Sequence, residues 1–252
     1  MNSPSIAFGL PEKRDLRNTV VAVTGASSGI GLSTTRLLVH SGAKVVASAR
    51  RVDRLNLLVS ELGEENVVAY YYDVQRHDQA QGLVDTALAS FGSLDTLVVC
   101  AGFGAYGSIL DYSDELLESM IITNVAGTLW PIRAAVKHFI EHNGGDIVIV
   151  ASVAGLRGDG NEAVYASTKF AQVGLAGALD RELREKGIRV STICPAGVST
   201  EFAIGLGRKA HDPMLNDLLQ PEDIAFAINT VLEQPRRIRT TLWSLWPMVQ
   251  QS

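Results

Sequence analysis

Residues 19–31 read TVVAVTGASSGIG and carry the strongest structural signal in the chain. An apolar, β-branched run ends at Thr24, and a glycine-rich turn follows it and opens a segment of helical character. Glycines let the backbone approach a phosphate closely, and the N-terminus of the next helix offers free N–H groups and the positive end of its dipole. The stretch therefore predicts a strand, turn and helix that bind the pyrophosphate of a dinucleotide. A tight turn without a ligand is the weaker alternative. The candidate cofactor-binding residues of the turn are Thr24, Gly25, Ser27, Ser28, Gly29, Ile30 and Gly31.

Short apolar runs continue to alternate with longer amphipathic segments along the whole chain. Strands are expected at 19–24, 44–48, 67–72, 96–100, 146–150, 189–193 and 238–245. Helices are expected at 30–40, 51–61, 77–90, 114–141, 163–186 and 221–233. Most of the strands are apolar throughout, which is typical of strands covered on both faces. This order predicts a doubly wound parallel α/β sheet, Rossmann-like, in a single domain that spans residues 1–252.

Bulk composition limits the possible partners. The formal net charge of −5 argues against a nucleic-acid partner, because phosphate binding depends on clustered Lys and Arg. No apolar run approaches the roughly 18 residues of a membrane span, and the first residues lack the pattern of a secretory signal. Cys100 and Cys194 lie far apart in apolar runs, so we expect neither a disulfide nor a metal site. A cytoplasmic location is the expected setting.

Two segments fall outside the alternation of strands and helices. Residues 1–18 are expected to form a loose arm before the first strand. Residues 202–220 are rich in Gly, His and Pro, which favours a substrate lid over a pocket. A plain surface loop fits the composition of residues 202–220 almost as well.

The end of the second strand discriminates between the two nicotinamide dinucleotides. An acidic residue here holds the ribose 2′-hydroxyl of NAD, whereas an arginine accommodates the 2′-phosphate of NADP. Arg50 and Arg51 follow this strand, and no carboxylate occurs before Asp53. A guanidinium can hold a phosphate with two hydrogen bonds, so the sequence predicts NADP(H) with Arg50 as a contact, against a merely solvated arginine. Asp73 and Val74 end the third strand, where a carboxylate could accept a hydrogen bond from adenine.

Three polar side chains further along fit hydride transfer between an alcohol and a carbonyl. Tyr165 and Lys169 are four residues apart on an expected helix and therefore share one face, and Ser152 follows the fifth strand. Lowering the pKa of a phenol from about 10 to about 7 requires that the phenolate be stabilised by about 4 kcal/mol relative to the neutral phenol. A neighbouring ammonium and a positive nicotinamide ring can supply this stabilisation. A lone Tyr-x-x-x-Lys pair arises often by chance, but the pair combined with the strand-end serine and the glycine turn does not.

These motifs resemble those of the short-chain dehydrogenase/reductase family over about residues 18–245. The cofactor motif Thr-Gly-x-x-x-Gly-x-Gly is matched by Thr24, Gly25, Gly29 and Gly31, and the family tetrad by Asn124, Ser152, Tyr165 and Lys169. The resemblance implies that Tyr165 is the acid/base and that Ser152 orients the substrate. Lys169 would lower the pKa of Tyr165 and bind the nicotinamide ribose. Asn124 would interrupt its helix and hold a water of the proton relay.

Two loops depart from the family pattern. Val99-Cys100-Ala101-Gly102 stands where the family has Asn-Asn-Ala-Gly, which removes an amide that braces the sheet. In the segment 195–200 the glycine of Pro-Gly-x-x-x-Thr has moved by one place, while Thr200 stays in position to meet the nicotinamide amide. The cofactor contacts implied for these loops and for the tetrad are Ala101, Gly102, Tyr165, Lys169, Pro195, Gly197, Val198 and Thr200.

The substrate pocket is expected beside this tetrad, at the ends of strands four, five and six. Its candidate residues are Phe103, Tyr106, Ser152, Val153, Leu156, Val198 and Phe202. Their mostly apolar character suits an aliphatic or aromatic ketone, while the C-terminal end of the chain resembles family members that act on small 3-hydroxy acids and serine. The sequence thus predicts an NADP(H)-dependent oxidoreductase, a carbonyl reductase. The alternatives are a non-catalytic, cofactor-binding regulatory protein and an epimerase on the same fold.

Two of the expected helices also predict assembly. The segments 114–141 and 163–186 carry more apolar surface than one sheet face needs, and the second is rich in small residues. In the resembling family these helices pair across a two-fold axis, and closed two-fold symmetry is the commonest outcome for soluble oligomers. We therefore expect a homotetramer or a homodimer. The alternative is a monomer whose small residues pack on its own sheet.

Overall fold

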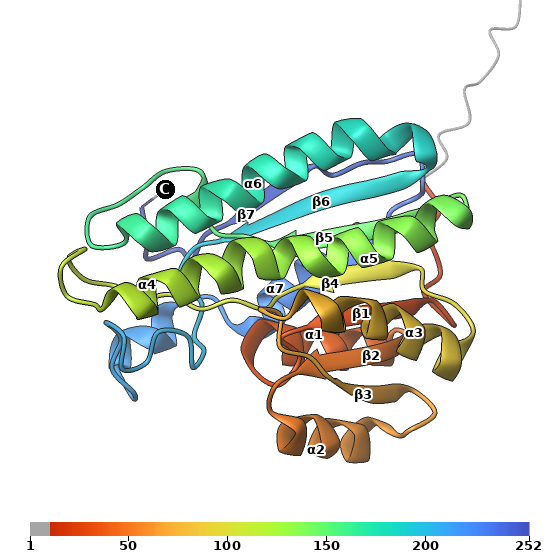
Figure 1. The fold of residues 1–252 in the computed structure, drawn as a ribbon, viewed down its shortest axis with the longest axis horizontal. Helices are drawn as coiled ribbons and strands as arrows, with labels where there is room; N and C mark the ends of the chain where they lie inside the picture. The colour runs from red at the N-terminus through yellow and green to blue at the C-terminus, as the bar shows by residue number, and fades with distance from the viewer. Residues whose placement is uncertain (1–10, 252) are drawn as a thin grey trace, which may run out of the picture.

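A seven-stranded parallel sheet lies between two layers of helices in the computed structural model, which describes residues 11–251 (Figure 1). The strand order is β3-β2-β1-β4-β5-β6-β7. The strands are β1 (Val20–Thr24), β2 (Lys44–Ala49), β3 (Val67–Tyr71), β4 (Thr96–Val99), β5 (Gly145–Val150), β6 (Ile188–Pro195) and β7 (Leu242–Leu245). The helices are α1 (Gly29–His40), α2 (Val52–Leu62), α3 (Ala80–Phe91), α4 (Asp114–Ile121), α5 (Gly127–Glu141), α6 (Ala163–Leu183) and α7 (Pro221–Leu232). The predicted doubly wound α/β fold is confirmed.

The apolar strands separate two hydrophobic cores. On one face, Leu38 of α1, Leu55 of α2 and Ile228 of α7 pack against β-branched side chains of the sheet. On the other face, Leu83 of α3 and Phe139 of α5 pack with residues of α6. Every residue of β1, β5 and β6 is buried, which explains why these strands show no alternation of polar and apolar residues.

The sheet topology places a crevice at the carboxyl end of β1. The chain proceeds outward from β1 through β2 to β3, then crosses back to place β4 on the other side of β1. Loops that follow β1 and β4 therefore leave the sheet in opposite directions, and ligands of open α/β sheets bind at such a switch point. The glycine-rich turn lies at this point.

The expected helix over residues 114–141 is not continuous. It consists of α4, a π-helical turn (Ile122–Ala126) and α5, so the interruption implied for Asn124 is present. The side-chain amide of Asn124 hydrogen-bonds the backbone of Phe103 at both its N–H and its C=O, which anchors the wide turn. The other boundaries differ from expectation by a few residues, most clearly in the last strand, which begins at Leu242.

The expectation of a loose N-terminal arm is wrong for residues 14–16. The backbone N–H of Arg14 donates to the carbonyl of Glu233, its guanidinium pairs with Asp146, and Leu16 is buried. Residues 1–10 of the expected arm lie outside the described residues. Within residues 11–251, every helix is too short or too polar to cross a membrane.

The segment 202–220 begins at the carboxyl ends of the strands, where residues between 202 and 208 line a cleft, and its role as a lid stays a prediction. It contains a short 3-10 helix (Pro213–Asp217), and Leu219 forms a β-bridge with Val198. This bridge brings the end of the segment back beside the loop that follows β6, close to where the segment begins. Its movement during binding stays a prediction.

Asp146 lies at the opposite end of the sheet and joins segments that are distant in sequence. It is only 2% exposed, and its carboxylate accepts hydrogen bonds from Arg14, Arg189 and Arg236. The guanidinium of Arg189 also donates to backbone carbonyls of the connection that follows α7. A single buried carboxylate thus holds the N-terminal segment, β6 and this connection together.

Replacing Asp146 with Ala should lower the free energy of unfolding by about 3–5 kcal/mol, because the buried Arg189 and the partly buried Arg14 lose their counter-charge. Urea denaturation measures this loss. The control is Glu61→Ala, which breaks a half-exposed pair with Arg36 and should lower stability by at most about 1 kcal/mol. Equal losses in the two variants would contradict the role given to Asp146.

Candidate active site

A cleft of about 820 Å³ opens at the carboxyl ends of the strands. This volume lies in the upper part of the range for ligand pockets, roughly 300–1,000 Å³. Its walls come from the loops that follow β1 to β6 and from the start of α6. Of the site residues predicted from the sequence, all line the cleft except Thr24, Asn124 and Leu156.

The glycine-rich turn forms one end of the cleft and fits a phosphate. Helix α1 begins at Gly29, and Ser28 at its N-cap makes no side-chain capping bond, so no side-chain cap occupies the N–H groups of the first turn. A side chain is excluded at Gly31, because a Cβ there would lie 2.4 Å from the carbonyl oxygen of Gly25. The backbone of this turn is therefore open to a ligand and closed to side chains, which is the arrangement a pyrophosphate requires.

Thr24 supports the turn from below rather than lining the cleft. Its side chain is fully buried, and its hydroxyl accepts hydrogen bonds from the backbone N–H groups of Cys100 and Ala101, both at 3.2 Å. The loop after β4 is therefore tied to the end of β1 although Cys100 replaces the bracing amide of the family pattern. Gly25 lies so close to the loop after β4 that a Cβ on it would be 2.9 Å from the backbone of Ala101.

Arg50 and Arg51 follow β2 and have different surroundings. The guanidinium of Arg51 donates to the hydroxyls of Ser27 and Ser28 and forms an ion pair with Glu201 at 3.0 Å, and this pairing lowers the pKa of the Glu201 carboxyl. Arg50 is exposed on the cleft wall and has neither a hydrogen bond nor an ion pair with any residue of the described chain. All donors of Arg50 thus remain available to a ligand. Asp73 and Val74 line the cleft farther along, at the end of β3.

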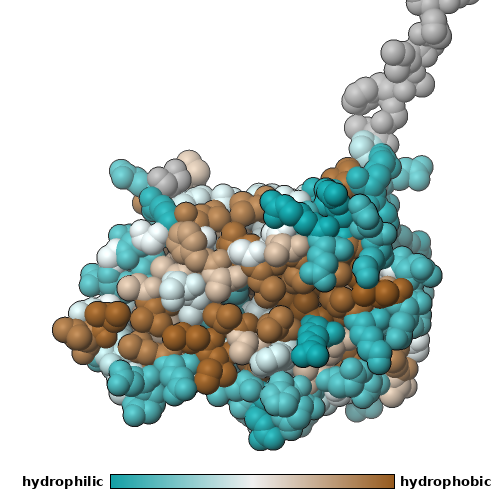
Figure 2. Space-filling model, turned by 45° about the horizontal axis from the view of Figure 1, so that its top comes forward, coloured by the Kyte–Doolittle hydropathy of each residue, from teal (hydrophilic) through white to brown (hydrophobic). Residues whose placement is uncertain are grey.

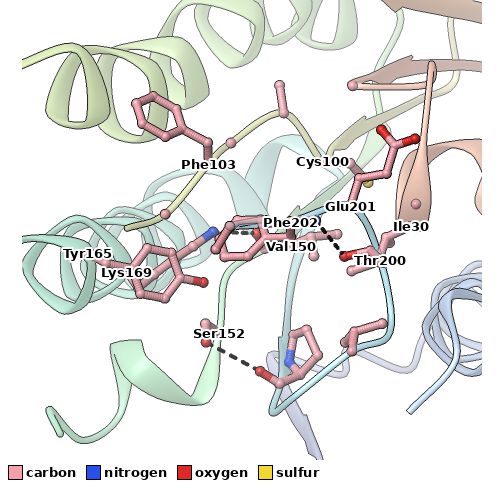
Figure 3. A pocket seen from close by; sticks show the side chains of 18 of the residues that line it. Ile30, Cys100, Phe103, Val150, Ser152, Tyr165, Lys169, Thr200, Glu201 and Phe202 are labelled. Carbon is pink, nitrogen blue, oxygen red and sulfur yellow. Dashed lines mark hydrogen bonds between the residues drawn. The ribbon is translucent and has the colours of Figure 1, made fainter. Parts of the chain in front are cut away.

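Ser152, Tyr165 and Lys169 meet at the other end of the cleft (Figure 3). Tyr165 and Lys169 project from the first turns of α6, and the Lys169 Nζ lies 5.7 Å from the centre of the Tyr165 ring. Ser152 follows β5, where its hydroxyl donates to the carbonyl of Pro195 and accepts from the N–H of Ala154. The predicted trio is therefore assembled, with all three side chains more than nine-tenths buried.

Burial governs the charges of this trio in the protein alone. Burial, together with the Tyr106 ring, raises the pKa of the Tyr165 phenol, while the Ser152 hydroxyl acts in the opposite direction. Burial also lowers the pKa of the Lys169 ammonium to about 8. In the protein without a ligand, the Lys169 ammonium donates to the Val150 carbonyl and the Gln172 side chain, and its implied lowering of the Tyr165 pKa stays a prediction.

Asn124 lies beneath the cleft and does not reach its surface. Its Nδ2 donates to the carbonyl of Phe103 and to the hydroxyl of Thr168, and its Oδ1 accepts from the N–H of Phe103. The side chain therefore joins the π-helical turn to the loop after β4 and to α6. The observed contacts of the Asn124 side chain thus hold these three segments in position.

The substrate end of the cleft is aromatic, as expected. The Tyr165 ring packs edge-on against Phe202 and Tyr106, with ring centres 5.5 and 5.8 Å away, and Phe103 and Val153 also line the wall. Leu156 does not line it and is 40% exposed. Leu156 is the residue that caps the 3-10 helix (Val153–Gly155), and its neighbour Arg157 lines the cleft in its place.

Two arginines that the sequence analysis missed also line this end. The Arg208 guanidinium lies 5.5 Å from the centre of the Tyr106 ring and 5.9 Å from that of Phe202, and Arg157 lies over Trp246. No local motif marks either arginine, since both contacts join segments far apart in the chain. The pocket therefore combines an aromatic wall with two cations, where the sequence analysis expected apolar side chains.

Comparison with known proteins agrees with this geometry. The family model for short chain dehydrogenase matches residues 19–210. An uncharacterized oxidoreductase of Staphylococcus aureus (strain MRSA252) is 31% identical over 92% of this chain and 99% of its own length. Among solved structures, an alcohol dehydrogenase from the archaeon Thermococcus sibiricus, complexed with 5-hydroxy-NADP, superimposes with a TM-score of 0.84 at 27% identity, covering 93% of this chain and 98% of that chain. The closed form of a serine dehydrogenase complexed with NADP+ superimposes with a TM-score of 0.86 at 30% identity, covering 93% and 97%.

Proposed function

Because the chain belongs to the short-chain dehydrogenase family, we propose that it is an NADP(H)-dependent oxidoreductase that interconverts a carbonyl and an alcohol. The observation that carries the proposal is one cleft with a phosphate-binding turn at one end and Ser152, Tyr165 and Lys169 at the other. Two similar structures are complexed with NADP+ or 5-hydroxy-NADP, which supports the choice of dinucleotide. Both cysteines are free, in keeping with the proposed cytoplasmic setting.

Each side chain has a separate task in this proposal. The bound dinucleotide supplies or accepts the hydride. Tyr165 gives a proton to the carbonyl oxygen in reduction and takes it back in alcohol oxidation. The Ser152 hydroxyl, held by the N–H of Ala154, turns its one proton from the Pro195 carbonyl to the same substrate oxygen and so fixes the position of the carbonyl carbon. Lys169 places a positive charge beside the phenol when the ammonium is formed.

Turnover tests the proposal directly. NADPH oxidation with a panel of ketones, aldehydes and 3-oxo acids should show activity, and Tyr165→Phe should lower turnover by about 100-fold or more, the usual loss when general acid–base catalysis is removed. The variant should keep its fold and its NADPH affinity. Near-normal turnover in Tyr165→Phe would remove this tyrosine from the mechanism. A chain that binds NADPH but converts nothing would instead support a regulatory protein, and inversion of a carbinol without net oxidation would support an epimerase.

The cofactor preference has its own test in Arg50. If its free guanidinium holds the 2′-phosphate, Arg50→Ala should weaken NADPH binding by about 1.5–3 kcal/mol, the range for hydrogen bonds to charged groups. NADH binding should barely change, and fluorescence titration measures both. Arg36→Ala is the matched control, because this arginine pairs with Glu61 on the surface. Equal losses for the two dinucleotides would contradict the assignment of Arg50.

A hydrophobic surface over α4, α5 and α6 supports the proposed assembly. Figure 2 shows apolar side chains gathered on the face that these helices form. Among them, Ile121 is 47% exposed and Phe170 is also 47% exposed. Gly174 faces open space, since a Cβ added to it would meet nothing within 4 Å. A small residue on an open helix face permits a close helix–helix approach, which supports assembly at Gly174, whereas Ala176 is buried in the chain's own core.

We expect light scattering at micromolar concentration to give a dimer or, with a second two-fold interface, a tetramer. Phe170→Glu should shift the mass toward the 27.0 kDa monomer, because a charge replaces an apolar side chain in the proposed contact. Leu57→Glu, on the exposed side of α2, is the control and should leave the mass unchanged. A wild-type mass near that of the monomer, with full activity, would end this proposal.

A further inference from the structure

Lys169 makes a contact that the predicted tetrad does not contain. Its Nζ donates to the Oε1 of Gln172 at 2.8 Å. It also donates to the carbonyl of Val150 at 3.2 Å (Figure 3). Gln172 is 1% exposed and lies three residues farther along α6, so the two side chains share one face of the helix. Both acceptors are uncharged.

The amide of Gln172 continues from Lys169 to the π-helical turn. Its Nε2 donates to the carbonyl of Asn124 at 2.9 Å and to the hydroxyl of Thr128 at 2.6 Å. The orientation of this amide is chemically determined. An ammonium can only donate and a carbonyl can only accept, so Oε1 must face Lys169 and Nε2 must face Asn124.

In this arrangement, both lone pairs of the Asn124 carbonyl oxygen already accept a hydrogen bond. It accepts from Gln172 and from the Thr128 hydroxyl, at 2.9 and 2.7 Å, and a carbonyl oxygen has two lone pairs. A relay water on this carbonyl, the role implied for Asn124 by family resemblance, would have to displace one of these buried donors. An amide also lacks the ability of a water or hydroxyl to pass a proton along by exchanging donor and acceptor roles.

We propose that Gln172 is the positioning residue of Lys169, linking the ammonium to the π-helical turn in place of a water. The inference rests on the proposed function, in which Lys169 acts beside Tyr165. Gln172 itself touches neither substrate nor cofactor. Together with the Val150 carbonyl, it fixes where Nζ lies and stabilises the charged form of a buried lysine.

The titratable groups around Lys169 provide no compensating negative charge at neutral pH. Tyr165 faces it from α6, Cys100 from the end of β4 and Cys194 from β6. Burial raises the pKa of all three groups, so each stays neutral. Within residues 11–251, the hydrogen-bond partners of the ammonium are therefore the two neutral oxygens of Val150 and Gln172.

The test measures the titration of Lys169 by NMR in protein labelled at its lysine side chains. The chain has six lysines, which keeps assignment by single Lys→Arg variants tractable. In the wild type, Lys169 should titrate near pH 8. In Gln172→Leu the midpoint should fall by about one pH unit or more, because the ammonium loses a hydrogen bond that favours its charged form. Gln172→Glu retains an acceptor and adds a negative charge, so its midpoint should rise.

Thr128→Val is the matched control. It removes two hydrogen bonds from the same buried network but none from Lys169, so it should lower thermal stability while moving the Lys169 midpoint by less than about 0.3 pH unit. A midpoint that stays unchanged in Gln172→Leu, or falls equally in Thr128→Val, would overturn the inference. Should Gln172→Leu fail to fold, an unchanged midpoint in Gln172→Glu would overturn it instead.

A second readout separates this inference from the proposed function. In active protein, the pH profile of kcat for Gln172→Leu should shift together with the Lys169 midpoint, while the KM for the carbonyl substrate stays close to that of the wild type. Absence of any turnover by the wild-type chain would refute the proposed function and leave the NMR result standing. An unshifted pH profile in an active Gln172→Leu variant would refute the positioning role alone.

Discussion

The close approach of three backbone segments at the carboxyl end of β1 is the constraint on which the site depends. The glycine turn, the start of α1 and the loop after β4 meet here with no room for side chains at Gly25 and Gly31. The buried Thr24 hydroxyl satisfies two backbone N–H groups that this approach would otherwise leave unpaired. The same contact leaves open the end of the cleft proposed to bind phosphate. It also aligns the β4 loop that leads to Phe103 and, through Phe103, to Asn124.

The catalytic end depends on a different balance, between burial and hydrogen bonding. The first turns of α6 bury Tyr165 and Lys169, while the π-helical turn opposite them presents a carbonyl and a hydroxyl to Gln172. Gln172 therefore joins the two sides, since its amide binds the carbonyl and the hydroxyl of the wide turn and passes the positional constraint on to Lys169.

Much of this arrangement can be predicted from the sequence, because it is encoded locally. The glycine turn, the apolar strands and the Tyr165–Lys169 spacing each depend on a few neighbouring residues, and their order along the chain determines the fold class. What could not be predicted depends on contacts between distant segments. Thr24 matches a cofactor motif yet serves the β4 loop, Leu156 is exposed outside the cleft, and Arg208 lies against the ring of the distant Tyr106. Gln172 is intermediate, since its spacing from Lys169 is visible in the sequence but its partners on the π-helical turn are not.

The buried lysine also shows that the site is maintained at the expense of stability. A shift of its pKa from 10.5 to about 8 means that holding the ammonium in the folded state costs about 3 kcal/mol relative to water at neutral pH. Between pH 8 and the pKa of an unfolded lysine, the unfolded chain binds more protons than the folded chain, so this penalty declines as pH rises. An apolar side chain of similar length would avoid the penalty altogether. Since the lysine is only 5% exposed and carries no ion pair among the described residues, packing alone gives no reason for a charged side chain there. A charge beside the phenol does give one, and the neutral oxygens of Val150 and Gln172 make that charge tolerable without cancelling it, whereas a carboxylate partner would remove its effect on Tyr165.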